Sequence, residues 1–132
     1  SEEIEKERKA EFFYWRGMAL IELEETVDAF ADMSKAVQLE KRNSRWYVGR
    51  GRAFWMKGDE KNAMSDWKRA IKLDPNNAEA YSERGEYFSS RNQIDKAMED
   101  FTMVIINIVP NANGKNILAN RLRFVIELPN RI

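Results

Sequence analysis

Residues 44–77 read SRWYVGRGRAFWMKGDEKNAMSDWKRAIKLDPNN, and the pattern of this stretch recurs along the chain every 34 residues. Arg-Gly pairs mark the three copies: Arg16-Gly17, Arg50-Gly51 and Arg84-Gly85. Other columns keep the same spacing: Ala29, Ala63 and Ala97; Asp32, Asp66 and Asp100; Phe13, Tyr47 and Tyr81. Self-similarity at a fixed spacing of this size predicts an array of stacked structural repeats.

Each copy is predicted to fold as a helical hairpin. In the quoted copy, the first half places a set of residues on one helical face: Tyr47, Arg50, Gly51 and Phe54. The second half does the same with Ala63, Trp67, Ala70 and Ile71. Gly58 and Asp59 separate the halves, and Pro75 ends the second because the residue before a proline disfavours the helical conformation. The small residues Gly51 and Ala63 would let the two helices approach closely.

These columns resemble the tetratricopeptide repeat (TPR), whose pattern has an aromatic residue, a large apolar residue followed by Gly, and later an Ala, an aromatic, an Ala and a Pro. The copies span residues 10–43, 44–77 and 78–111. Two features depart from the family pattern. The first is an arginine, in all three copies, at the position where the family more often has Leu. The second concerns the closing Pro: copy one has Lys41 in its place, and copy three has it one residue later, at Pro110.

The resemblance implies an all-α solenoid of helical hairpins in a right-handed superhelix, and we expect one domain over residues 1–132. Residues 1–9 contain no helix breaker and would extend the first helix outward. Residues 115–127 carry an apolar helical stripe and would form a C-terminal capping helix, because a stack of hairpins leaves its last apolar face exposed. Residues 101–109 are rich in β-branched side chains, which favour a strand, but the repeat register predicts a helix.

The repeated Arg and Asp columns predict an ion pair inside every hairpin. In an antiparallel hairpin Arg16, Arg50 and Arg84 should lie across from Asp32, Asp66 and Asp100. A half-buried pair of this kind is better evidence for register than for stability. Because an active site rarely occurs three times in one small domain, we interpret these residues as structural.

Composition excludes several classes of function. The 132 residues contain no His and no Cys, which removes the commonest general base, the thiol nucleophile and the usual transition-metal ligands. The 22 basic and 22 acidic residues cancel, whereas nucleic-acid-binding domains are usually strongly basic. The longest uncharged run, residues 101–114, is too short to insert across a membrane. We therefore predict no catalytic, cofactor-binding or metal-binding residues; a small enzyme using clustered carboxylates is the least favoured alternative. The lack of cysteine suits the cytosol and the periplasm alike.

In a TPR array the first helix of each hairpin lines a concave groove, as the resemblance implies. Large apolar residues that the core pattern does not demand fall on that side: Tyr14, Trp15, Met18, Trp55 and Met56. Such residues on a polar surface are the usual anchors of a protein interface. Arg45 and Arg52 fall beside them and would meet acidic groups. The alternative is that Trp15 or Trp55 packs against the N-terminal extension or the next helix.

The sequence therefore predicts a non-catalytic module that binds a protein or an extended peptide in the concave groove. Chaperone-binding members of the family hold a C-terminal carboxylate with Lys, Asn and Arg side chains. The corresponding residues here are Tyr14, Met18, Gly49, Glu79 and Glu83, so a clamp of that type is not expected. The alternative function is self-association through the helix at 101–109 or the C-terminal segment.

Overall fold

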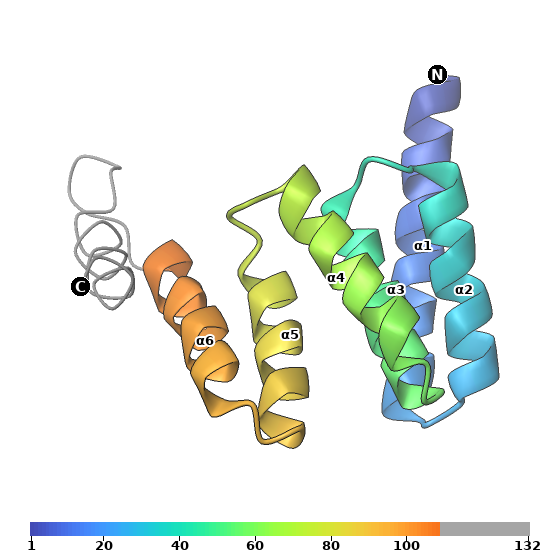
Figure 1. The fold of residues 1–132 in the computed structure, drawn as a ribbon. Coiled ribbons are helices and arrows are strands. Elements are labelled where there is room, and N and C mark those ends of the chain that lie inside the picture. The colour runs from blue at the N-terminus through green and yellow to red at the C-terminus, as the bar shows by residue number, and fades with distance from the viewer. Residues whose placement is uncertain (109–132) are drawn as a thin grey trace, which may run out of the picture. The chain divides into compact units, whose positions relative to one another are not determined.

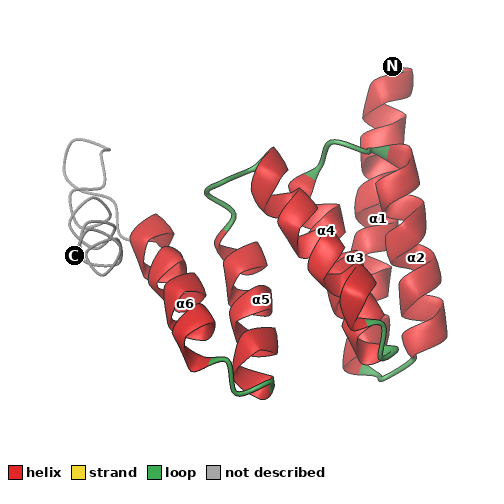
Figure 2. Cartoon of the chain, viewed as in Figure 1, coloured by secondary structure: helices red, strands yellow, loops and turns green. Residues whose placement is uncertain are grey.

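The computed structural model describes residues 1–108, which form six helices and no strand. In chain order they are α1 (Glu2–Glu22), α2 (Thr26–Leu39), α3 (Ser44–Met56), α4 (Glu60–Leu73), α5 (Ala78–Ser90) and α6 (Ile94–Ile108) (Figures 1 and 2). The chain divides into two compact units, Ser1–Pro75 and Asn76–Ile132. The first unit contains α1 to α4, and the described part of the second contains α5 and α6. The predicted capping helix at 115–127 lies outside the described residues.

Side chains just before the helices define where most of them begin. The Ser1 hydroxyl accepts a hydrogen bond from the Ile4 backbone N–H at 3.4 Å, which starts α1 at the very beginning of the chain. Three further helices begin at Asn43, Asp59 and Asn77, whose side-chain oxygens accept hydrogen bonds from backbone N–H groups in the first turn. Such caps satisfy donors that have no partner inside the helix.

A left-handed residue turns the chain between the two helices of each hairpin. These residues are Glu24, Gly58 and Asn92, with φ of 61°, 85° and 58°, and they recur at the repeat spacing. A glycine adopts this conformation without steric cost, whereas a residue with a Cβ atom does not. The sequence analysis identified the break only at Gly58. Asn92 belongs to a residue type that is enriched in this conformation, whereas Glu24 does not mark such a turn by itself.

Close helix packing inside each hairpin depends on the glycine column. A Cβ atom on Gly51 would lie 2.6 Å from the Trp67 ring, and Trp67 is fully buried. The equivalent positions, Gly17 and Gly85, face Met33 and Phe101 at 2.9 and 2.8 Å. The large residue on the second helix thus occupies the space that the glycine leaves, as the sequence predicted for Gly51. Figure 1 shows the resulting pairing of α1 with α2, α3 with α4 and α5 with α6.

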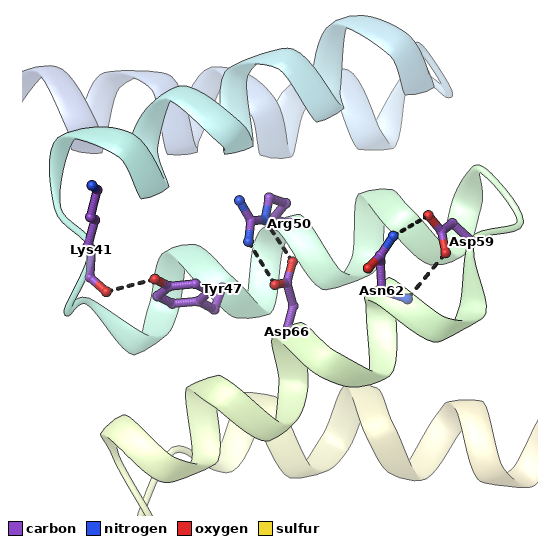
Figure 3. A network of polar contacts seen from close by, with 6 residues as sticks. All are labelled: Lys41, Tyr47, Arg50, Asp59, Asn62 and Asp66. Carbon is purple, nitrogen blue, oxygen red and sulfur yellow. Dashed lines mark hydrogen bonds and ion pairs between the residues drawn. The ribbon is translucent and has the colours of Figure 1, made fainter.

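The predicted Arg–Asp pairs are confirmed in all three hairpins. Arg50 donates two hydrogen bonds to Asp66, at 2.8 Å from Nε and 2.9 Å from Nη2 (Figure 3). The pairs Arg16–Asp32 and Arg84–Asp100 have the same two-bond geometry, with distances of 2.6 to 2.9 Å. The hydrogen bond with Asp66 raises the pKa of Arg50, and burial raises the pKa of Asp66 against the opposing effect of Arg50. This cost of burying Asp66 supports a role in fixing the hairpin register more than in adding stability.

The β-branched run near the end of the described chain is helical, as the repeat register predicted. Residues 101–108 belong to α6, which continues to Ile108. Helix formation here depends on the hairpin contact with α5, since tertiary packing overrides intrinsic propensity. The pairing of Arg84 with Asp100 and the packing of Phe101 on Gly85 supply that contact.

Candidate binding surface

Helices α1 and α3 pack together in the first unit and bring an arginine over two aromatic rings. The guanidinium carbon of Arg45 lies 4.9 Å from the centroid of the Trp15 ring and 5.1 Å from that of Tyr14. Trp15 remains 51% exposed, although it is one of the largest apolar side chains of α1. An exposed tryptophan held beside a cation is a candidate contact for a partner.

Tyr14 lies beneath this surface. Its side chain is only 3% exposed. Its ring packs edge-on against Trp15, with the centroids 5.1 Å apart, and tilted by 43° against Trp46, with the centroids 4.8 Å apart. A Cβ atom on Gly49 would lie 3.0 Å from the Tyr14 ring, so the missing side chain at Gly49 lets α3 approach it. Tyr14 was predicted as a groove residue; in this structure its buried ring fixes the position of Trp15.

Trp46 was not singled out from the sequence, yet it supports the same surface. It is buried, and its indole Nε1–H donates a hydrogen bond to the Glu40 carboxylate at 3.0 Å. This bond satisfies the polar atom of the ring and holds the ring against Tyr14. Helical phase could have indicated the contact, because Trp46 and Gly49 lie three residues apart on one side of α3.

Three more predicted residues extend the surface along the two helices. Met18 follows Trp15 by one turn of α1, and Arg52 and Met56 follow Arg45 by two and three turns of α3. Met56 is exposed, whereas Met18 and Arg52 are half-buried. We define the α1–α3 face as Trp15, Met18, Arg45, Arg52 and Met56. Methionine adapts its shape to a partner, so the face combines a rigid ring, two flexible apolar side chains and two cations.

Trp55 has a different neighbour from Trp15. Its ring lies edge-on to the buried Trp67 of α4, with the two centroids 5.8 Å apart. The side chain is half-buried. Trp55 therefore packs within the second hairpin, in the manner of the alternative that the sequence left open, although part of its surface stays accessible.

Arg45 differs in charge environment from the repeated arginines. Among residues 1–108 no carboxylate pairs with it, and the first turn of α3 contains no acidic residue. Residues 44–77 carry eight basic and four acidic side chains, so this part of the chain is net positive. The α1–α3 face thus offers an uncompensated cation beside an exposed aromatic ring.

Two features of the described residues bear on other kinds of site. Across residues 1–108, no group of three or more Asp and Glu side chains is placed to hold a metal ion. None of the six described helices has both the length and the apolar character needed to cross a membrane. What the surface presents is shape, apolar area and charge.

The fold and this surface define the class: an all-α protein built from repeated helical hairpins. A family model described as TPR repeat matches residues 51–89. The first TPR of Spaghetti (RPAP3), bound to the HSP90 peptide SRMEEVD, is 20% identical over 94% of this chain and 98% of its own, with a TM-score of 0.71. The Arabidopsis OM64 TPR domain is 24% identical over 92% of this chain and 99% of its own, with a TM-score of 0.70. The second TPR of Spaghetti, bound to the same peptide, is 20% identical over 78% and 94%, with a TM-score of 0.67.

No curated protein sequence matches the chain. The family model and the fold nevertheless agree with the 34-residue columns of the sequence. The chain thus has the fold of tetratricopeptide-repeat domains and matches the TPR family model over residues 51–89, in agreement with its Arg-Gly, Ala and Asp columns.

Proposed function

We propose that the chain is a non-catalytic interaction module that binds a protein or an extended peptide segment on the α1–α3 face. The observation that carries this proposal is the exposed Trp15 ring, which lies against the Arg45 guanidinium and edge-on to the buried Tyr14 ring. Fixing a large ring in one orientation before binding reduces the entropy lost on association. Met18 and Met56 would provide further apolar contact, and Arg52 a second cation.

The structural neighbours support this class of function. Two of them are TPR domains bound to a peptide. Their fold is shared with this chain, whereas their identity to it is low, so the ligand itself does not transfer. The partner of this chain is to be identified from the chemistry of its own surface.

A replacement at Trp15 tests the proposal. Trp15→Ala should weaken partner capture from a lysate while leaving the helical circular dichroism unchanged, because half of this ring lies outside the core. Val27→Ala is the matched control, since Val27 is an exposed apolar residue of α2 in the same unit. Equal capture of every partner by wild type, Trp15→Ala and Val27→Ala would contradict partner binding at the α1–α3 face.

We further propose that this chain does not hold a C-terminal carboxylate by the clamp of chaperone-binding relatives. Of the corresponding positions, Tyr14 and Gly49 are buried, Met18 is apolar, and Glu79 and Glu83 have the sign that repels a carboxylate. The peptide SRMEEVD and its C-terminally amidated form should therefore bind with the same affinity, or not at all. Tenfold tighter binding of the free acid would contradict this.

One observation favours a second function, self-association. Exposed apolar side chains follow α6 at alternating spacings of four and three residues: Ile94, Met98, Phe101, Ile105 and Ile108. This spacing is typical of a helix that packs lengthwise against another helix. Light scattering over a hundredfold range of protein concentration tests it. A constant monomer mass excludes self-association, and a rising mass that Ile105→Ser abolishes supports it.

A further inference from the structure

We infer that the α1–α3 face recognises a carboxylate next to a large apolar side chain in its partner, with Arg45 as the contact for the carboxylate. The inference rests on the proposed function and adds the chemistry of the ligand. Arg45 differs in one respect from the other arginines that lie over two aromatic rings.

Four arginines among the described residues lie over two aromatic rings each. Three of them are the repeated arginines, and Arg50 is representative: its guanidinium carbon lies 5.5 Å from the Tyr47 ring and 5.7 Å from the Phe54 ring. Each of these three also donates two hydrogen bonds to an aspartate of the facing helix. Two rings against the guanidinium and one carboxylate at its edge therefore form a recurrent arrangement in this protein.

Arg45 has the first half of that arrangement and lacks the second. Its guanidinium lies closer to two rings than that of Arg50 does, at 4.9 and 5.1 Å. No carboxylate in residues 1–108 pairs with it. A partner carboxylate would complete at Arg45 the arrangement that Asp66 completes at Arg50.

The geometry around Arg45 suits a bidentate carboxylate contact. A guanidinium that stacks on rings keeps its planar N–H edge available, and two parallel N–H donors match the two oxygens of a carboxylate. The side chain is half-buried, which strengthens a charge contact relative to one in bulk water. The net positive charge of residues 44–77 favours the approach of an acidic segment.

The neighbouring Trp15 specifies the second part of the ligand. Its exposed ring lies 4.9 Å from the guanidinium, so a residue adjacent to the bound acid can reach it. Met18, one turn further along α1, widens the apolar area. The partner is thus expected to carry Asp or Glu directly beside a large aliphatic or aromatic residue. The carboxylate is a side chain within the segment, and its recognition does not use the clamp positions of the family.

A phage-displayed library of random decapeptides provides the test. Selection on wild type should enrich Asp or Glu next to a large apolar residue. Selection on Arg45→Gln should lose the acidic residue, whereas Arg69→Gln should retain it. Arg69 is the matched control because it is an exposed arginine of the same unit, on α4, and its replacement changes the net charge equally. Thermal melts establish that each variant is folded.

A double-mutant cycle then tests whether Arg45 is the residue that contacts the acidic side chain of the peptide. With a synthetic copy of an enriched peptide, Arg45→Gln should raise Kd at least tenfold, because a contact between two charged groups is lost. Replacing the peptide acid by its amide should raise Kd equally, and combining both changes should add little. Arg45→Lys keeps the charge without the planar fork and should fall between wild type and Arg45→Gln. If Arg45→Gln does not fold, Arg45→Lys and the peptide amide still give the coupling.

The outcomes separate this inference from the proposed function. Peptides that require Trp15 but show no acidic enrichment, or additive losses at Arg45 and the peptide acid, overturn the inference and leave the proposed function in place. Peptides that bind independently of Trp15, or a library that yields no binder, overturn both.

Discussion

Replacing the aspartates of the first two hairpins by asparagine tests how the exposure of the remaining arginine changes the stability lost when an ion pair is broken. Arg16–Asp32 and Arg50–Asp66 belong to the same unit and share their hydrogen-bond geometry. They differ in the arginine: the Arg16 side chain is 50% exposed, and that of Arg50 is 24% exposed. After Asp32→Asn, water can solvate the Arg16 guanidinium, whereas after Asp66→Asn much of the Arg50 guanidinium remains out of water.

The expected magnitudes follow from this difference. Removing one partner of a fully buried ion pair costs about 3–5 kcal/mol, and an exposed pair contributes about 0–1 kcal/mol. Asp66→Asn should therefore lower the free energy of unfolding by about 2–3 kcal/mol, and Asp32→Asn should lower it clearly less. Both replacements keep the shape of the side chain, so the difference reflects the arginine left behind.

Urea unfolding at pH 7, followed by circular dichroism at the helical band, measures both losses. The double replacement Arg50→Met/Asp66→Leu is the control, and it should unfold at nearly the wild-type free energy, because no charge is left uncompensated. Equal losses for Asp32→Asn and Asp66→Asn would refute the reasoning, since rehydration of the arginine would then not set the cost.

Three further replacements test the packing, the turns and the caps. Gly51→Ala should lower the free energy of unfolding in urea by about 1–3 kcal/mol, because its Cβ would lie 2.6 Å from the Trp67 ring; an unchanged value would contradict the packing described. Glu24→Gly should raise that free energy by about 0.5–1 kcal/mol, since Glu24 has a φ of 61°, and a decrease would argue against strain there. Hydrogen bonds from Asn62 lower the pKa of Asp59 below its ordinary 3.8, so its stabilising effect is complete above pH 3.8 and disappears as the pH falls through the lowered pKa. Asp59→Asn removes this dependence, and Tm of wild type should fall more steeply than that of the variant below pH 3.8; parallel curves would exclude the effect.

The repeat spacing accounts for why the hairpins could be predicted from the sequence. Arg50 and Asp66 recur in step with Gly51, so one antiparallel arrangement explains all three copies at once. The same register assigned residues 101–108 to a helix despite their β-branched side chains. Glu24 was not predicted as a left-handed turn residue, because only its alignment with Gly58 reveals the turn.

The binding surface was predicted only in part, because helical phase gives the side of a helix and not the depth of a side chain. Phase placed Tyr14 and Trp15 together on the groove side. The depth depends on Gly49, whose missing Cβ lets α3 approach Tyr14 and covers its ring. The contact of Arg45 with Trp15 joins residues 30 positions apart. It depends on the same approach of α3 to α1, so no local sequence pattern predicted it.

The dissociation constant of the tightest decapeptide selected on wild type tests the central claim most directly, when it is measured for wild type, Trp15→Ala and Val27→Ala. A binding face on α1 and α3 predicts at least a tenfold increase for Trp15→Ala, with Val27→Ala within twofold of wild type. The same dissociation constant for all three folded proteins would contradict the claim that this chain binds its partner through the α1–α3 face.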